Sequence, residues 1–178
     1  MIYKLEHITT RIHQTLLVAL AIRVIRVLTL IQPKKMNVFS GPKPEKALGL
    51  LEDCGLPTSD LDTKQFADYL YLGDTDNPVG IIGLEIIGSV ALLRSLAVTK
   101  DAQGNGYGQT LVFAIEDYAK SKNINELYLL TETAKDFFKN LNYTSIQKES
   151  APESIKNTSE FSSVCPQSAV LMNKKLHR

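Results

Sequence analysis

Residues 103–108 read QGNGYG, which places three glycines at alternate positions between two segments of different hydrophobic pattern. The preceding residues 90–99, VALLRSLAVT, form an apolar run typical of a buried strand. After the glycines, apolar residues recur on one face of a helix: Leu111, Val112, Ile115 and Ala119. The sequence therefore predicts a strand, a glycine loop and an amphipathic helix in succession.

A glycine loop before a helix is suited to binding an anion. Glycine lets the backbone approach a ligand closely or adopt a positive φ, and the first turn of a helix presents unpaired N–H groups. This arrangement favours a phosphate or pyrophosphate. The dinucleotide fingerprint is incomplete, because its third glycine is replaced by Gln109, and the Gly-Lys-Ser/Thr of a phosphate-binding P-loop is absent.

From Met36 onward, the pattern predicts alternating strands and helices. We expect strands at 36–40, 66–72, 79–87, 90–99 and 126–131, with the third and fourth forming an antiparallel pair. Helices are expected at 45–54, after the glycine loop and at 134–140. A closing hairpin of 143–147 and 169–173 would enclose a long polar connection with one helical turn near 153–157. The predicted fold is α/β (α+β), a mixed central sheet flanked by helices, in one domain of residues 36–178.

The composition of the 178-residue chain is consistent with a globular protein of one domain. Cys54 and Cys165 lie far apart without metal-ligand spacing, His7, His13 and His177 are all terminal, and there is no signal-peptide cleavage pattern. We therefore expect a cytoplasmic protein without a metal site.

The N-terminal segment 1–35 differs in charge from the rest. It carries six basic side chains against the single acidic Glu6, a net charge of +5, which leaves −4 on residues 36–178 because the whole chain carries +1. The acidic remainder argues against nucleic-acid binding. The apolar run 16–22 of the N-terminal segment is too short to span a membrane. This extension is predicted to lie outside the fold, either as a peripheral or membrane-surface helix or as residues ahead of a start at Met36.

The combination Gln-x-x-Gly-x-Gly, formed by Gln103, Gly106 and Gly108, resembles the pyrophosphate loop of the GNAT superfamily of acyl-CoA-dependent N-acetyltransferases. The likeness extends from about Met36 to the C terminus through the same order of elements. A narrower likeness in ALLRSLAV, LYLLTETAKDFF and the tail ESIKNTSEFSSVCPQSAV is to the ArsN-type acetyltransferases of bacterial arsenic-resistance operons. Those enzymes are related to ones that acetylate phosphinothricin-like amino acids.

The resemblance implies a site for acetyl-CoA. Backbone N–H groups of the loop and helix start would hold the pyrophosphate, and three strand residues would lie beside the pantetheine. Thr131 takes the place of an asparagine that often bonds the pantetheine in relatives. The implied cofactor residues are Leu96, Ala97, Val98, Gln103, Gly104, Asn105, Gly106, Tyr107, Gly108, Gln109, Thr110 and Thr131.

Acetyl transfer to an ammonium requires a group that removes a proton. Glu85, the lone carboxylate in IIGLEIIG, is the first candidate, because burial would raise its pKa; the alternative is that it points to solvent. Glu132 is the reserve, or else a helix-start residue. Phe138 occupies the position where relatives usually carry the tyrosine that protonates the leaving thiolate.

Arg94 and Ser95 are the candidate substrate residues. An arginine among leucines can clamp a carboxylate, phosphinate or arsenate-like group in a bidentate fork, or form an ordinary ion pair. Cys165 is an alternative substrate contact or an apolar filler.

The sequence predicts transfer of acetyl from acetyl-CoA to the amine of a small, anionic, amino-acid-like acceptor. A coenzyme A-binding module without turnover and a protein or peptide N-acetyltransferase are the alternatives. The acceptor and a homodimeric state are left open by the residues alone.

Overall fold

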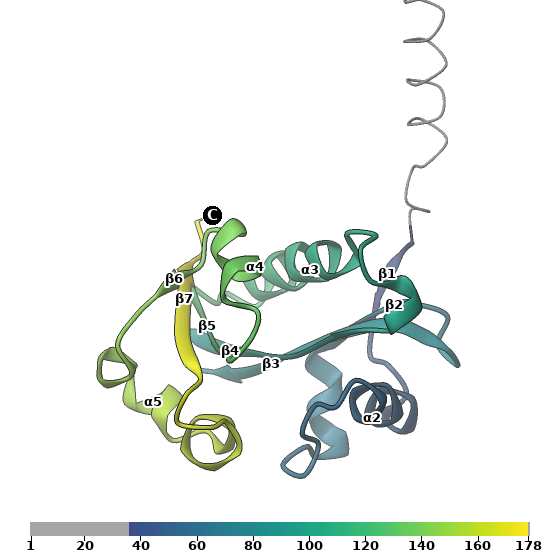
Figure 1. The fold of residues 1–178 in the computed structure, drawn as a ribbon. Helices are drawn as coiled ribbons and strands as arrows, with labels where there is room; N and C mark the ends of the chain where they lie inside the picture. Colours follow the sequence, from purple (N-terminus) through teal and green to yellow (C-terminus); the bar gives the residue numbers. More distant parts are fainter. Residues whose placement is uncertain (1–35, 178) are drawn as a thin grey trace, which may run out of the picture. The chain divides into compact units, whose positions relative to one another are not determined.

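The computed structural model describes residues 36–177, so the predictions for residues 1–35 lie outside the described part of the chain. The described chain forms a mixed sheet of seven strands in the order β1-β2-β3-β4-β5-β7-β6 (Figure 1). All neighbours are antiparallel except β4 and β5, which run parallel. The strands are β1 (Val38–Ser40), β2 (Tyr69–Gly73), β3 (Pro78–Ile87), β4 (Val90–Val98), β5 (Glu126–Thr131), β6 (Thr144–Ser145) and β7 (Val170–Lys175).

Helices cover both faces of the sheet. The helices α3 (Tyr107–Ser121) and α4 (Lys135–Asn140) lie on one face, and α2 (Pro44–Asp53) and α5 (Glu153–Lys156) lie on the other (Figure 1). Each face has its own apolar core, because side chains alternate along a strand: Leu93 of β4 packs in the core beneath α3, whereas Leu92 packs with Ile155 of α5. None of the helices in residues 36–177 is long and apolar enough to cross a membrane.

The predicted elements are confirmed with small shifts of their ends. Strand β5 has the expected bounds, and β3 and β4 form the expected antiparallel pair through the turn at Gly88 and Ser89. The segment predicted as a strand from residue 66 begins instead as the 3-10 helix η1 (Thr63–Asp68), whose N terminus has a capping box between Asp62 and Gln65. The polar connection also contains an unexpected π-helix, η4 (Glu160–Val164).

A bulge interrupts β4 in its middle. Ile81 pairs with Ala97 but Gly83 pairs with Arg94, so β4 contains one residue more than β3 over this interval. Ser95 takes a positive φ of 57°, which is uncommon for a residue other than glycine. Its Oγ lies 3.0 Å from the hydroxyl of Tyr69, whose ring covers Gly83. The side chain of Tyr69, on β2, thus reaches the bulge across Gly83 of β3.

We predict that Gly83→Ala destabilises the fold by about 1–3 kcal/mol, because a Cβ at this position would overlap the buried ring of Tyr69. Gly49→Ala in α2 is the matched control: its Cβ would meet nothing within 4 Å, and alanine favours a helix interior by about 0.5–1 kcal/mol. Urea unfolding of both variants measures the difference. Equal stabilities would contradict the packing argument.

Candidate functional site

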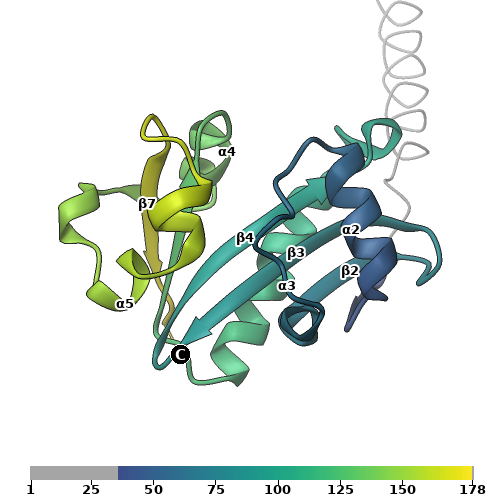
Figure 2. The same cartoon turned by 90° about the horizontal axis from the view of Figure 1, so that it is seen from below.

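The parallel pairing of β4 and β5 is short. It joins Val90–Leu92 to Glu126–Tyr128 and goes no further, although both strands continue beyond it. Figure 2 shows β4 diverging from the part of the sheet that contains β7. The edge of β4 that faces β5 therefore has no strand partner from Leu93 to Val98 among the described residues. Its main-chain groups ahead of the Val98 carbonyl, which accepts a hydrogen bond from Gln103, are available to a ligand.

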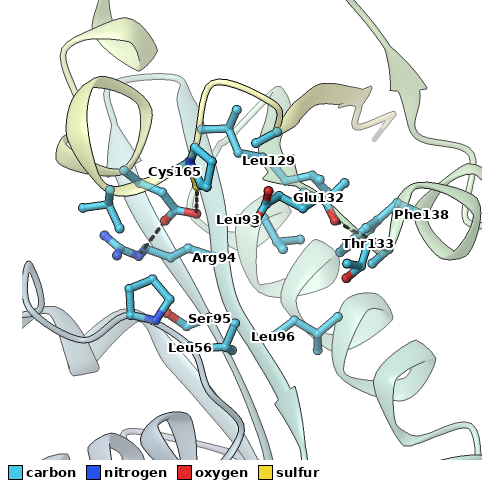
Figure 3. A pocket seen from close by; sticks show the side chains of 18 residues that line it. Leu56, Leu93, Arg94, Ser95, Leu96, Leu129, Glu132, Thr133, Phe138 and Cys165 are labelled. Carbon is cyan, nitrogen blue, oxygen red and sulfur yellow. Dashed lines mark hydrogen bonds and ion pairs between the residues drawn. The ribbon is translucent and has the colours of Figure 1, made fainter.

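A cavity of about 300 Å³ lies at this separation. Its walls come from β4, β5, the start of α4, the loop after α2 and the tail, as Figure 3 shows. The contributing residues are Leu56, Pro57, 93–96, 129–134, Phe138, Glu160, 164–166 and Ala169. The volume is at the lower end of the range for small-molecule sites.

The glycine loop has the predicted backbone geometry. Gly104 and Gly106 have φ values of 79° and 77°, in the left-handed region that favours glycine. Gln103 donates from Nε2 to the carbonyl of Val98 at 3.1 Å, and Asn105 donates from Nδ2 to the carbonyl of Ala102 at 3.0 Å. These two side chains therefore stabilise the loop at the end of β4.

Helix α3 begins immediately after this loop. No side chain caps its N terminus and its first turn contains no acidic residue, so the positive end of the helix dipole is not neutralised there. Thr110 bonds the carbonyl of Gly106, and a Cβ on Gly108 would lie 3.4 Å from the ring of Phe137. Of the predicted loop residues, Tyr107 and Gly108 are half-buried and Gln109 is exposed.

Arg94 is the most highly connected side chain beside the cavity. Its guanidinium is only 3% exposed and reaches Asp60 from Nη2 at 2.6 Å, Glu85 from Nη1 at 3.2 Å and Glu160 from Nε at 3.0 Å. Three carboxylates thus surround one cation. A substrate anion would have to replace one of them, so the predicted anion clamp requires an exchange of partners.

Glu160 faces the cavity from η4 and has unusual electrostatics. Burial raises the pKa of its carboxyl to about 7, and the opposing charge of Arg94 offsets only part of this effect. Its Oε2 is close to Arg94 Nε but forms no hydrogen bond with any described residue. Cys165 donates from Sγ to the other oxygen, Oε1, at 3.7 Å (dashed in Figure 3).

Cys165 is held in the thiol form. Burial, followed by the nearby charge of Glu160, raises the pKa of Cys165 to about 12. A thiol in this state is a weak donor and a poor nucleophile at neutral pH. Its position in the cavity wall therefore fits a contact residue better than a reactive one.

The two predicted carboxylates occupy different places. Glu85 points to Arg94 and is 26% exposed, but it does not line the cavity. Glu132 does line the cavity, where it is exposed and accepts a hydrogen bond from the hydroxyl of Ser168 at 2.8 Å. Thr131 also lines the cavity, and its Oγ1 accepts the N–H of Ala134 at 3.0 Å.

The aromatic residues near α4 provide no exposed hydroxyl. Phe138 lines the cavity and packs edge-on against Tyr143. Tyr143 is buried in the core, where burial raises its pKa well above the usual range. Neither residue is suited to protonating a leaving group.

Sequence reasoning missed Asp60 and Glu160. Asp60 gives no signal, because it lies in the irregular loop between α2 and η1 and reaches Arg94 only through the fold. Glu160 belongs to the tail segment SEFSSVCPQS, next to Phe161. The one sequence feature that could have indicated Glu160 is its place beside Phe161 in this tail segment.

Comparisons with known proteins identify the family. The model of the GNAT acetyltransferase family matches residues 32–143. An uncharacterised N-acetyltransferase of Chlorobaculum tepidum is 36% identical over 66 residues, which cover 37% of this chain and 42% of the relative. The chain belongs to the GNAT acetyltransferase family.

Solved structures share the fold. N-acetylglutamate synthase from Neisseria gonorrhoeae, complexed with coenzyme A and N-acetyl-glutamate, superimposes with a TM-score of 0.67 at 21% identity over 81% of this chain and 36% of that chain. A GNAT family acetyltransferase from Staphylococcus aureus Mu50 gives 0.66 at 16% identity over 80% of this chain and 100% of that chain. The matched part of the chain thus spans less than half the length of the C. tepidum relative and of the synthase.

We predict that Arg94→Met lowers the free energy of unfolding by about 3–5 kcal/mol at neutral pH, because three carboxylates lose their shared cation. Arg94 lowers the pKa of Glu160, so its removal raises that pKa further above the unfolded value. The folded state then binds more protons, and the variant should regain stability on acidification from about pH 8 to about pH 5.

Chemical denaturation at the two pH values provides the measurement. Lys120→Met, which removes the exposed ion pair with Asp117, is the control and should change stability by less than about 1 kcal/mol. An equally small effect of Arg94→Met would contradict the role of Arg94 as the shared cation.

Proposed function

We propose that the protein transfers an acetyl group from acetyl-CoA to the amine of a small molecule. The observation that carries this proposal is the unpaired edge of β4, which borders a cavity and leads directly into the glycine loop at the start of α3. Membership of the GNAT acetyltransferase family supports the same reaction.

Acetyl-CoA would lie along this path. N–H groups of residues 104–110 would hold the pyrophosphate, where glycine conformations and the helix dipole favour an anion. Leu96, Ala97 and Val98 would place their main-chain groups beside the pantetheine amides. An N–H of this strand would also stabilise negative charge on the thioester oxygen. The bulge at Ser95 lies immediately before these three residues.

The proposed acceptor is an amino-acid-like amine. The small cavity and its cover by the tail favour a small molecule over a protein or peptide, which needs an open groove. The structural neighbour from N. gonorrhoeae is complexed with an acetylated amino acid, N-acetyl-glutamate. Together with the likeness of the tail to ArsN-type enzymes, this supports testing phosphinothricin and its arsenic analogue. A cytoplasmic location stays a prediction from the sequence, as does dimerisation.

Thiol release from acetyl-CoA in the presence of candidate amines tests the proposed reaction. The panel contains phosphinothricin, its arsenic analogue, L-glutamate and a lysine peptide. Selective turnover of one small amine supports the proposal. Turnover of the peptide alone would favour a protein acetyltransferase, and coenzyme A binding without any turnover would favour a binding module.

We predict that Gly106→Glu weakens coenzyme A binding by at least about 100-fold, because a carboxylate would face the pyrophosphate and like charges repel by several kcal/mol. Gly41→Glu is the matched control. Its φ of 68° imposes similar backbone strain and its Cβ position is equally open, but it lies in the connection after β1. Titration calorimetry measures both variants, and equal affinities would contradict the loop assignment.

A further inference from the structure

Four carboxylates lie in or near the cavity, and they differ in their contacts and exposure. Asp60 and Glu85 are occupied by the two terminal nitrogens of Arg94 and do not line the cavity. Glu132 lines the cavity but is exposed to water and bonded to Ser168. Glu160 lines the cavity, is 12% exposed, and has a buried Oε2 without a hydrogen-bond donor in the described chain.

We propose that Glu160 is the group that accepts the proton of the acceptor ammonium. This inference rests on the proposed acetyl transfer and replaces Glu85 in that role. Glu160 and the unpaired edge of β4 border the same cavity, so an amine bound there can contact the carboxylate while it approaches an acetyl group held along β4. Arg94 is the positioning residue, because its Nε lies 3.0 Å from Oε2 of Glu160 in an ion pair that lacks hydrogen-bond geometry.

The protonation behaviour of Glu160 agrees with this geometry. Burial raises the pKa of its carboxyl to about 7, so the carboxylate is available at neutral pH and takes up a proton with little cost. Several charged or titratable groups face it: Arg94 from β4, Asp60 from the loop after α2, Glu85 from β3, Tyr69 from β2 and Cys165 at the end of η4.

The reaction balances with acetyl-CoA as the second substrate. The ammonium gives one proton to the carboxylate of Glu160, and the free amine attacks the thioester carbon. A carbon–nitrogen bond forms and the carbon–sulfur bond breaks, with the electron pair leaving on the thiolate. The second proton of the nitrogen passes to the thiolate directly or through water, and Glu160 returns its proton to solvent. The products are the amide, free coenzyme A and one proton.

Two small amines test the role of Glu160 with the full chain. Methylamine is an ammonium ion at neutral pH, whereas hydroxylamine is mainly the free base and needs no prior deprotonation. We expect Glu160→Gln to slow transfer to methylamine by about 100-fold or more and to change transfer to hydroxylamine only a few-fold. In the unsubstituted protein, kcat/KM for methylamine should rise with pH and level off near about pH 7; in the variant this break should be absent, because kcat/KM should keep rising with pH as more methylamine becomes the free base.

Two further substitutions make the test specific. Glu153→Gln changes an exposed glutamate of α5, seven positions before Glu160, and should leave both reactions unchanged. Glu85→Gln is the competing variant: a selective loss of the methylamine reaction there, with Glu160→Gln unaffected, would overturn the inference. Equal losses for both amines in Glu160→Gln would assign it a structural role and also overturn it.

Binding measurements keep this test separate from the proposed function. Calorimetry with acetyl-CoA should give the same affinity for Glu160→Gln as for the unsubstituted protein. If the unsubstituted protein binds acetyl-CoA but transfers acetyl to neither amine nor to the acceptor panel, the proposed function fails and this inference fails with it. If Glu160→Gln transfers acetyl to both amines as fast as the unsubstituted protein does, only the inference fails.

Discussion

The short parallel pairing of β4 and β5 is the constraint on which the site depends. Three residue pairs hold the two halves of the sheet together, and beyond Leu92 the strands separate. Leaving the polar main-chain groups of a strand edge buried without hydrogen-bond partners costs free energy. The separation therefore produces both the cavity and a row of main-chain groups suited to a ligand that carries amides of its own.

The separated halves need a link on the face opposite α3, and Arg94 supplies it. It lies on β4 immediately before the bulge and reaches Asp60 in the loop after α2 and Glu160 in the tail. Two segments about a hundred residues apart in the sequence are thus fixed against one strand. Burial raises the pKa of Glu160, the most buried carboxylate of the cavity, and the charge of Arg94, which is shared with Asp60 and Glu85, offsets only part of this effect.

The cofactor side could be predicted from the sequence, because its features are local. The glycine loop, the preceding strand and the amphipathic helix are adjacent in the chain, and each has a pattern that depends on backbone conformation and burial. The Arg94 cluster could not be predicted in the same way. Its members come from β3, β4, the α2 loop and the tail. The apolar residues around Glu85 in the sequence predict a buried carboxylate, whereas in the fold Glu85 forms an ion pair with Arg94. The bulge at Ser95 left no pattern in the strand.

This contrast follows from how the two halves of the site recognise their ligands. Main-chain groups of β4 and the glycine loop can hold a shared cosubstrate with few demands on side chains beyond glycine. Selection of an acceptor requires side chains, and here η4 and the residues after it provide Glu160, Cys165 and Ala169. Under the proposed function, we expect substitutions in residues 160–169 to alter the acceptor without disturbing the glycine loop, because acceptor specificity depends on the residues of the site and not on the fold.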